Sequence, residues 1–157
     1  MRCDLLTLFV VALLTSAPLL AQTPVPAQAN EAAIVAFAEE ATIRALNFKQ
    51  GDIGGLTNAR PDFTPEGWNA FMKHIAGWLD PKGAPTFSSS FVPSGSALVV
   101  GEKNGILYLK IPGTLKQMQR QSSTTYRATI EVQAGGEPIK IQHLEQTTCL
   151  GSSTNCK

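Results

Sequence analysis

Few side chains in this sequence could take part in catalysis, and their spacing matches no common catalytic arrangement. The two histidines, His74 and His143, lie far apart, and the sequence has no His-Glu-x-x-His, Cys-x-x-Cys, Gly-x-Ser-x-Gly or phosphate-binding glycine motif. An acid with an opposing tyrosine could transfer a proton, and Asp62 with Tyr108 or Tyr126 is the candidate pair. Asp62 lies just before a predicted helix start, where an acid is stabilised structurally. We therefore expect a protein that is not an enzyme and needs no cofactor.

The cysteines point to a disulfide in an oxidising compartment. Cys3 lies in the N-terminal leader, whereas Cys149 and Cys156 lie close together at the other end of the chain. A bond between these two would close a small loop in the C-terminal tail, residues 149–157. A metal site needs more ligands than two thiols, and the nearest histidine is His143, so we expect no bound metal.

The N-terminus predicts export. Met1–Asp4 precede an apolar run from Leu5 to Leu20, and small residues follow it. We predict a signal peptide over residues 1–21, or as far as residue 29, and a linker over residues 22–29. The alternative is a retained anchor in the inner membrane, although the run falls short of the roughly 20 apolar residues that span a bilayer.

Charge and composition exclude some partners. The net charge is +1 and 16% of the residues are charged, which leaves no basic stripe for nucleic acid and no acidic tail. The low charged fraction indicates a surface that meets other proteins.

Two helices are predicted in the first half of the domain. Asn30 is a suitable N-cap for a helix that continues to about Phe48, and the glycine-rich residues 51–55 are expected to form a loop. Thr64 and Pro65 then predict the start of a second helix. Its apolar stripe at helical spacing is expected to pack in the core: Trp68, Phe71, Met72, Ile75 and Leu79.

The second half of the domain has the period of strands. Strands are predicted over residues 86–92, 97–102, 106–111, 114–119 and 125–132, with a last strand that begins near Ile139. Asn104-Gly105 predicts a tight hairpin turn, and Pro112-Gly113 predicts a bulge or a bend. We thus expect an α+β domain over residues 30–148, with two N-terminal helices on one side of a curved antiparallel sheet of about four to five strands. The polar stretch at residues 117–122 is either a contact loop carrying Gln117 and Arg120 or a solvated hairpin tip.

The run at residues 60–71 resembles the Phe-Thr-x-x-Gly-Trp-x-x-Phe helix start of the DotI/IcmL family, which serves type IVB secretion systems and related TraM-like conjugation systems. The alanine-rich first helix, Val-Pro-Ser-Gly at residues 92–95 and the tyrosine-containing strand at residues 125–130 extend the likeness. The signature residues, which the resemblance implies are structural, are Phe63, Thr64, Gly67, Trp68 and Phe71.

The resemblance implies a periplasmic domain with a cone-like fold, similar to nuclear-transport-factor-like domains. Such a domain would act without enzymatic activity, by contact with other secretion subunits or with itself, near the membrane. One departure is that family members with an established core role carry a cytosolic segment and a membrane helix before this domain, whereas only Met1–Asp4 precede the apolar run here. An accessory protein and a secreted effector therefore remain open.

A second hypothesis is a periplasmic small-molecule-binding or isomerase-like cone protein. It predicts an open apolar cavity between helices and sheet. The assembly hypothesis predicts an interior filled by residues such as Phe37, Trp68 and Phe71.

Overall fold

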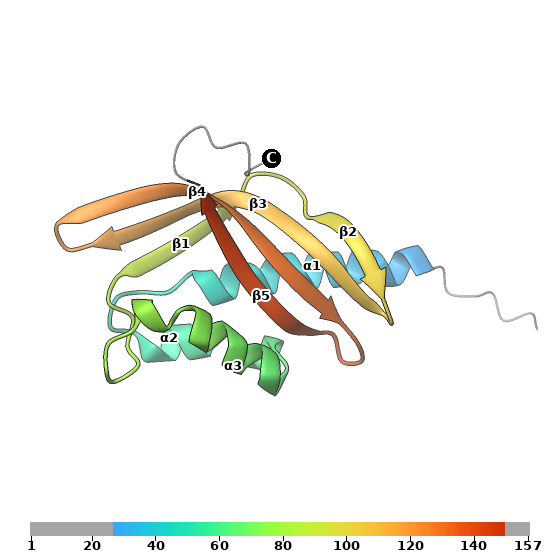
Figure 1. Cartoon of the computed structure of the whole chain (residues 1–157), viewed down its shortest axis with the longest axis horizontal. Helices are drawn as coiled ribbons and strands as arrows, with labels where there is room; N and C mark the ends of the chain where they lie inside the picture. The colour runs from blue at the N-terminus through green and yellow to red at the C-terminus, as the bar shows by residue number, and fades with distance from the viewer. Residues whose placement is uncertain (1–26, 150–157) are drawn as a thin grey trace, which may run out of the picture.

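A computed structural model describes residues 27–149 of the 157-residue chain (Figure 1). The helices are α1 (Ala27–Leu46), α2 (Ile53–Thr57) and α3 (Pro65–His74), with short 3-10 turns at Arg60–Asp62 and Ala76–Trp78. The strands are β1 (Ser88–Pro93), β2 (Leu98–Lys103), β3 (Ile106–Gln119), β4 (Ser122–Gly135) and β5 (Lys140–Cys149). The predicted α+β class with a five-stranded antiparallel sheet is confirmed. The cone-like shape remains a prediction.

The sheet is organised around the long strands β3 and β4, which pair over 14 residues each. β5 lies on the free side of β4, while β1 and β2 share the other edge of β3. Alternate residues of β3 and β4 are buried, so one face of the sheet belongs to the core and the other is open. We call the open face the outer face.

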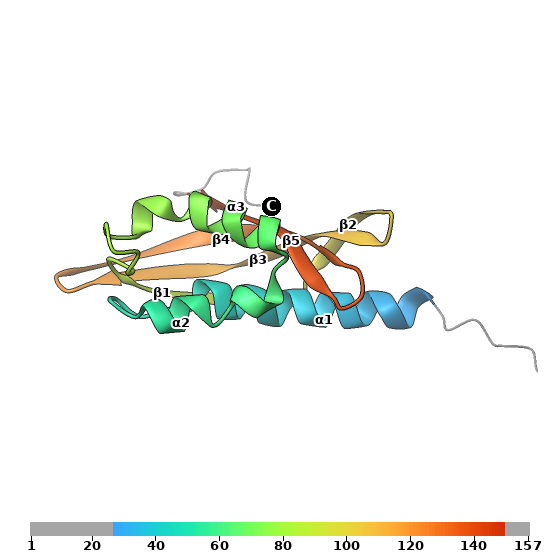
Figure 2. The same ribbon diagram turned by 90° about the horizontal axis from the view of Figure 1, so that it is seen from below.

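Helix α1 crosses the sheet, as Figure 2 shows along the lower side of the view, and contacts β1, β3, β4 and β5. Its buried stripe includes Ala38, Ala41 and Ala45, which have no exposed surface. Because alanine is short, the helix backbone can approach the strands closely. Helix α3 instead lies along β5, and the helices share one hydrophobic core with the sheet.

The start of α1 differs from the prediction. The helix begins at Ala27, so Asn30 lies inside it and does not cap it, and residues 27–29 of the predicted linker are helical. Alanine and glutamine are good helix formers, and nothing between Ala27 and Asn30 interrupts the helix.

The predicted loop at residues 51–55 was also partly wrong, because Ile53–Thr57 form the short helix α2. Asp52 caps it, and its Oδ1 accepts a hydrogen bond from the Gly55 backbone N–H at 2.8 Å. A Cβ on Gly55 would lie 2.6 Å from Asp52 Oδ2, so a larger residue would require the Asp52 side chain to shift. Residues 27–149 therefore contain three α-helices where two were expected.

The second predicted helix starts at the expected residue and ends early. Thr64 Oγ1 accepts from the Gly67 backbone N–H at 3.0 Å, which confirms the N-cap. The helix stops at His74, and Ala76–Trp78 form a 3-10 turn that contains Gly77. Glycine disfavours helix, so the stripe is divided between two elements. Ile75 is nevertheless fully buried, whereas Leu79 packs at the edge of the core.

Of the bulge or bend predicted at Pro112-Gly113, the bulge was wrong, since β3 pairs with β4 without a register shift there. The Pro112 carbonyl oxygen accepts a hydrogen bond from the Ser94 N–H. The N–H and C=O of one strand residue point to the same side, so an N–H on residue 112 would point to this edge as well. The edge here lies between the segment of β3 that pairs with β2 and the segment that pairs with β1. Proline therefore removes no ladder hydrogen bond at this point. Gly113 allows close contact with β1, because a Cβ at residue 113 would lie 2.4 Å from ring atoms of Phe91 and 2.6 Å from the Val92 carbonyl oxygen.

The predicted Asn104-Gly105 hairpin is confirmed, with φ of 54° and 73° at these two residues. Bulges occur elsewhere. Val100 is the extra residue in β2, and Gln142 is the extra residue in β5. The second bulge explains why Ile141 and Leu144, three residues apart, are both buried.

Candidate functional site

The signature residues of the predicted second helix form a joint between α3 and β5. Phe63, Trp68 and Phe71 are buried and contact one another, with ring centroids 5.3–5.6 Å apart. The Thr64 backbone N–H donates to the Ile141 carbonyl oxygen at 2.9 Å. The hydrogen bond ties the first residue before α3 to the bulged part of β5.

Gly67 allows this joint to close. A Cβ at residue 67 would lie 2.6 Å from the Ile141 carbonyl oxygen and 2.8 Å from that of Gln142. Real Cβ atoms do not approach backbone so closely, so any larger residue would push α3 away from β5. Each signature residue thus has a structural task, which favours a scaffold over a catalytic centre at this motif.

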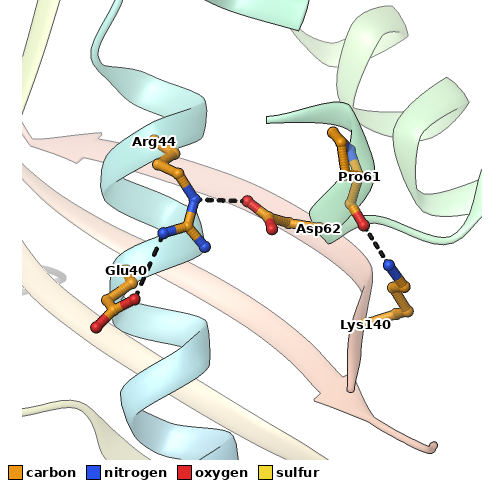
Figure 3. Close-up of polar contacts among 5 residues, drawn as sticks. All are labelled: Glu40, Arg44, Pro61, Asp62 and Lys140. Atoms are coloured by element: carbon orange, nitrogen blue, oxygen red, sulfur yellow. Dashed lines mark hydrogen bonds and ion pairs between the residues drawn. The ribbon is translucent and has the colours of Figure 1, made fainter. Parts of the chain in front are cut away.

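Asp62 is bound by an arginine, not by a tyrosine. Arg44 Nε donates to Asp62 Oδ2 at 2.8 Å, and Arg44 also contacts Glu40 Oε2 at 3.4 Å (Figure 3). The Asp62 side chain is only 16% exposed. Neither Tyr108 on β3 nor Tyr126 on β4 makes a hydrogen bond with Asp62, so the predicted acid–tyrosine pair is not formed. The Arg44–Asp62 ion pair joins α1 to the turn before α3.

The hydrogen bond from Arg44 to Asp62 raises the pKa of the Arg44 guanidinium above its ordinary value. The guanidinium therefore stays charged across the neutral range. Beside this pair, Lys140 Nζ donates to the Pro61 carbonyl oxygen, which fixes the same turn to the start of β5 (Figure 3).

The outer face of the sheet carries a shallow cavity of about 250 Å³. Its polar lining comes from neighbouring strands, where Lys110 Nζ lies 3.4 Å from Glu131 Oε1 and His143 Nε2 lies 3.3 Å from Glu145 Oε2. Glu131 and Glu145 are direct cross-strand neighbours. These side chains are about half exposed, so the cavity is an open, mixed-charge surface with no enclosed reaction chamber. Within residues 27–149, no cluster of three or more histidines, cysteines or acids could hold a metal ion.

The predicted contact stretch forms the tip of the β3–β4 hairpin. Gln117 is partly buried on β3, and Arg120 is exposed in the turn between the two strands. Its role in contact stays a prediction.

Strand β2 offers a second exposed surface, because Leu98, Val99 and Val100 expose 60%, 38% and 56% of their surface. Sequence reasoning missed this surface, because the apolar run looked like an ordinary half-buried strand.

Cys149 is buried at the end of β5. Cys156 lies outside the described residues, so the disulfide between them also remains a prediction. The predicted signal peptide lies outside them as well. Among the helices that the structure describes, none combines the length and the apolar character needed to cross a bilayer.

No family model matches the sequence, and no curated protein matches it significantly. Solved structures do match. An IcmL-like type IV secretion system protein from Legionella pneumophila aligns with a TM-score of 0.64 and 14% identity, over 78% of this chain and 96% of that one. The periplasmic domain of DotI aligns with a TM-score of 0.64 and 16% identity, over 76% of this chain and 96% of that one.

The chain has the fold of the DotI periplasmic domain. The resemblance that the sequence signature indicated is thereby confirmed at the level of the fold. Nearly all of the DotI domain has a counterpart here, so this chain contains the whole DotI-like fold. At 16% identity the likeness to DotI concerns the fold, and function is argued separately.

Proposed function

We propose that this protein is an exported DotI/IcmL-like domain that acts by protein–protein contact in or near a type IVB secretion or conjugation apparatus. The main observation in support is the fold shared with the DotI periplasmic domain over 96% of that domain. The N-terminal apolar run supports transfer to the periplasm, by a cleaved signal peptide or a retained anchor.

The character of the described surface supports a role without chemistry. Asp62 is held by Arg44, the signature residues pack the joint between α3 and β5, and the outer-face cavity is open and half exposed. The rival isomerase-like hypothesis requires an open apolar interior. Trp68 and Phe71 instead belong to the hydrophobic core between helices and sheet, and Phe37 is partly buried against that core.

The decisive experiment is fractionation of the native cell followed by crosslinking. A tagged full-length protein is expected in the periplasmic or inner-membrane fraction, crosslinked to subunits of the secretion apparatus. Deletion of the gene is expected to reduce secretion, and the wild-type copy should restore it. Cytosolic full-length protein, or crosslinks that contain no secretion subunit, would contradict the proposal.

A further inference from the structure

We propose that the end of the β3–β4 hairpin binds an acidic segment of a partner protein. We call residues 114–127 the basic arm. This inference rests on the proposed function and adds the chemistry of the partner, which the fold comparison leaves open.

The basic arm is part of an acid-free stretch of the sequence. Residues 103–130 contain five lysines and arginines and no aspartate or glutamate, although the whole chain has a net charge of only +1. Lys110 is paired with Glu131, but Lys116, Arg120 and Arg127 form no ion pair within residues 27–149. These three exposed cations therefore concentrate positive charge at one end of a nearly neutral molecule.

The register of the hairpin places the cations along one surface. Lys116 pairs with Thr125, and Arg127 pairs with Thr114. Lys116 and Arg127 are therefore diagonal neighbours on the outer face, with their Cα atoms roughly 7–8 Å apart. Arg120 follows in the turn beyond the last pair of the hairpin. An extended peptide presents alternate side chains on one face at a spacing of about 6.8 Å, which suits this row.

The position of the basic arm favours a protein over a membrane. In both views the arm lies at the opposite end of the molecule from the start of α1, beyond the C-terminal end of that helix (Figures 1 and 2). A helix of 20 residues is about 30 Å long, so a membrane segment that precedes Ala27 would be held far from the arm. Amphipathic helices that lie on membranes combine basic residues with a large apolar face. The exposed large hydrophobic side chain on the arm is Met118.

The chain itself supplies no extended acidic segment. Residues 1–26 contain one acid, Asp4, and residues 150–157 contain none. In a second copy, Glu39 accepts from the Ala97 N–H at 2.6 Å and Glu40 contacts Arg44. The exposed glutamates without an ion pair within residues 27–149 lie on separate elements and form no row along one extended segment: Glu31, Glu66, Glu102 and Glu137. A separate protein with several carboxylates along an extended segment is the occupant that fits.

The test measures binding of a fluorescent ten-residue peptide of alternating Glu and Thr to the full chain at low salt. The variant combines Lys116→Gln, Arg120→Gln and Arg127→Gln. The matched control removes three exposed lysines elsewhere, Lys49→Gln, Lys73→Gln and Lys82→Gln. We expect about a tenfold loss of affinity for the first variant and less than a twofold loss for the control. The single change Arg120→Gln, in the turn outside the ladder, serves if the triple variant unfolds.

Each other outcome would overturn the inference. An equal loss of affinity in both triple variants would indicate only a diffuse electrostatic attraction by the whole molecule. Absence of peptide binding by the wild type would exclude an acidic ligand. Stronger arm-dependent binding to phosphatidylglycerol vesicles would assign the arm to a bilayer, and a changed oligomeric state would assign it to a second copy. The crosslinking experiment above can succeed or fail independently of these results.

Discussion

Gly67 of α3 faces the carbonyl oxygen of Ile141 in β5 so closely that a Cβ on the glycine would lie 2.6 Å from that oxygen. Helix and strand therefore meet backbone to backbone, next to the hydrogen bond from Thr64 N–H to the same carbonyl. The glycine of the sequence signature is explained by this contact.

The first prediction concerns Gly67→Ala. Alanine favours a helix over glycine by about 1 kcal/mol, yet here the clash with β5 should lower the free energy of unfolding by about 1–3 kcal/mol. Urea unfolding monitored by circular dichroism measures the difference. Gly77→Ala is the control, because a Cβ there meets nothing within 4 Å and should change stability little. Equal stability of Gly67→Ala and wild type would refute the close contact.

Trp68→Ala tests the aromatic cluster of the joint. The indole is mostly buried and contacts both Phe63 and Phe71. Its removal should lower the free energy of unfolding by roughly 3–5 kcal/mol. Lys73→Ala, on an exposed part of the same helix, should be nearly neutral. A Trp68→Ala variant that melts like the wild type would contradict the predicted role of this side chain in the core.

The contact between Gly113 and Phe91 should appear as a thermodynamic coupling. Gly113→Ala alone is expected to cost about 1–3 kcal/mol, because its Cβ would overlap the Phe91 ring. In a Phe91→Leu background the same change should cost less, since the ring is absent. A double-mutant cycle from denaturant unfolding gives the coupling energy, and purely additive effects would argue against the overlap.

Thr42 offers a stabilising substitution. Its hydroxyl is buried in α1 and has no hydrogen-bond partner among residues 27–149. Thr42→Val keeps the shape and removes an unsatisfied polar group, so stability should rise by about 1 kcal/mol. Thr57→Val is the contrast, because Thr57 Oγ1 donates to the Ile53 carbonyl at 3.0 Å. Thermal melts of the two variants should shift in opposite directions, and a destabilised Thr42→Val would show that the hydroxyl has a partner.

The Arg44–Asp62 pair should contribute modestly to stability. Arg44 is 43% exposed, so Asp62→Asn is expected to cost no more than about 1 kcal/mol, less at high salt. Because the Arg44 pKa is raised in the folded state, its contribution is fully present below the unfolded pKa and is lost only as the pH rises through the folded one. The difference between wild type and Arg44→Gln should thus not vary between pH 7 and 10. A drop within that range would contradict the assignment.

Local signals in the sequence predicted much of this fold. Thr64-Pro65 marked the start of α3, and Asn104-Gly105 marked a hairpin, because capping and turn chemistry depend on a few adjacent residues. The error at Pro112 arose where tertiary structure decides. Pro112 is tolerated in β3 only because the edge there changes partner from β2 to β1, and that topology is invisible in a strand pattern.

The candidate surfaces were harder to predict than the fold. Arg120 could be placed at a hairpin tip, but the alignment of Lys116 with Arg127 depends on the register of two 14-residue strands. Likewise, the partner of Asp62 lies 18 residues earlier in the chain, on a different helix. Such pairings over long sequence separations follow from packing, not from composition.

The bulge at Val100 bears on aggregation at high protein concentration. β2 is an apolar strand at the border of the sheet, and a flat strand of this kind would template the addition of further chains into fibrils. The bulge increases the local twist of β2 and interrupts its regular hydrogen-bonding pattern, so a further strand cannot pair with it continuously. The bulge thereby disfavours edge-to-edge aggregation through this exposed apolar edge strand.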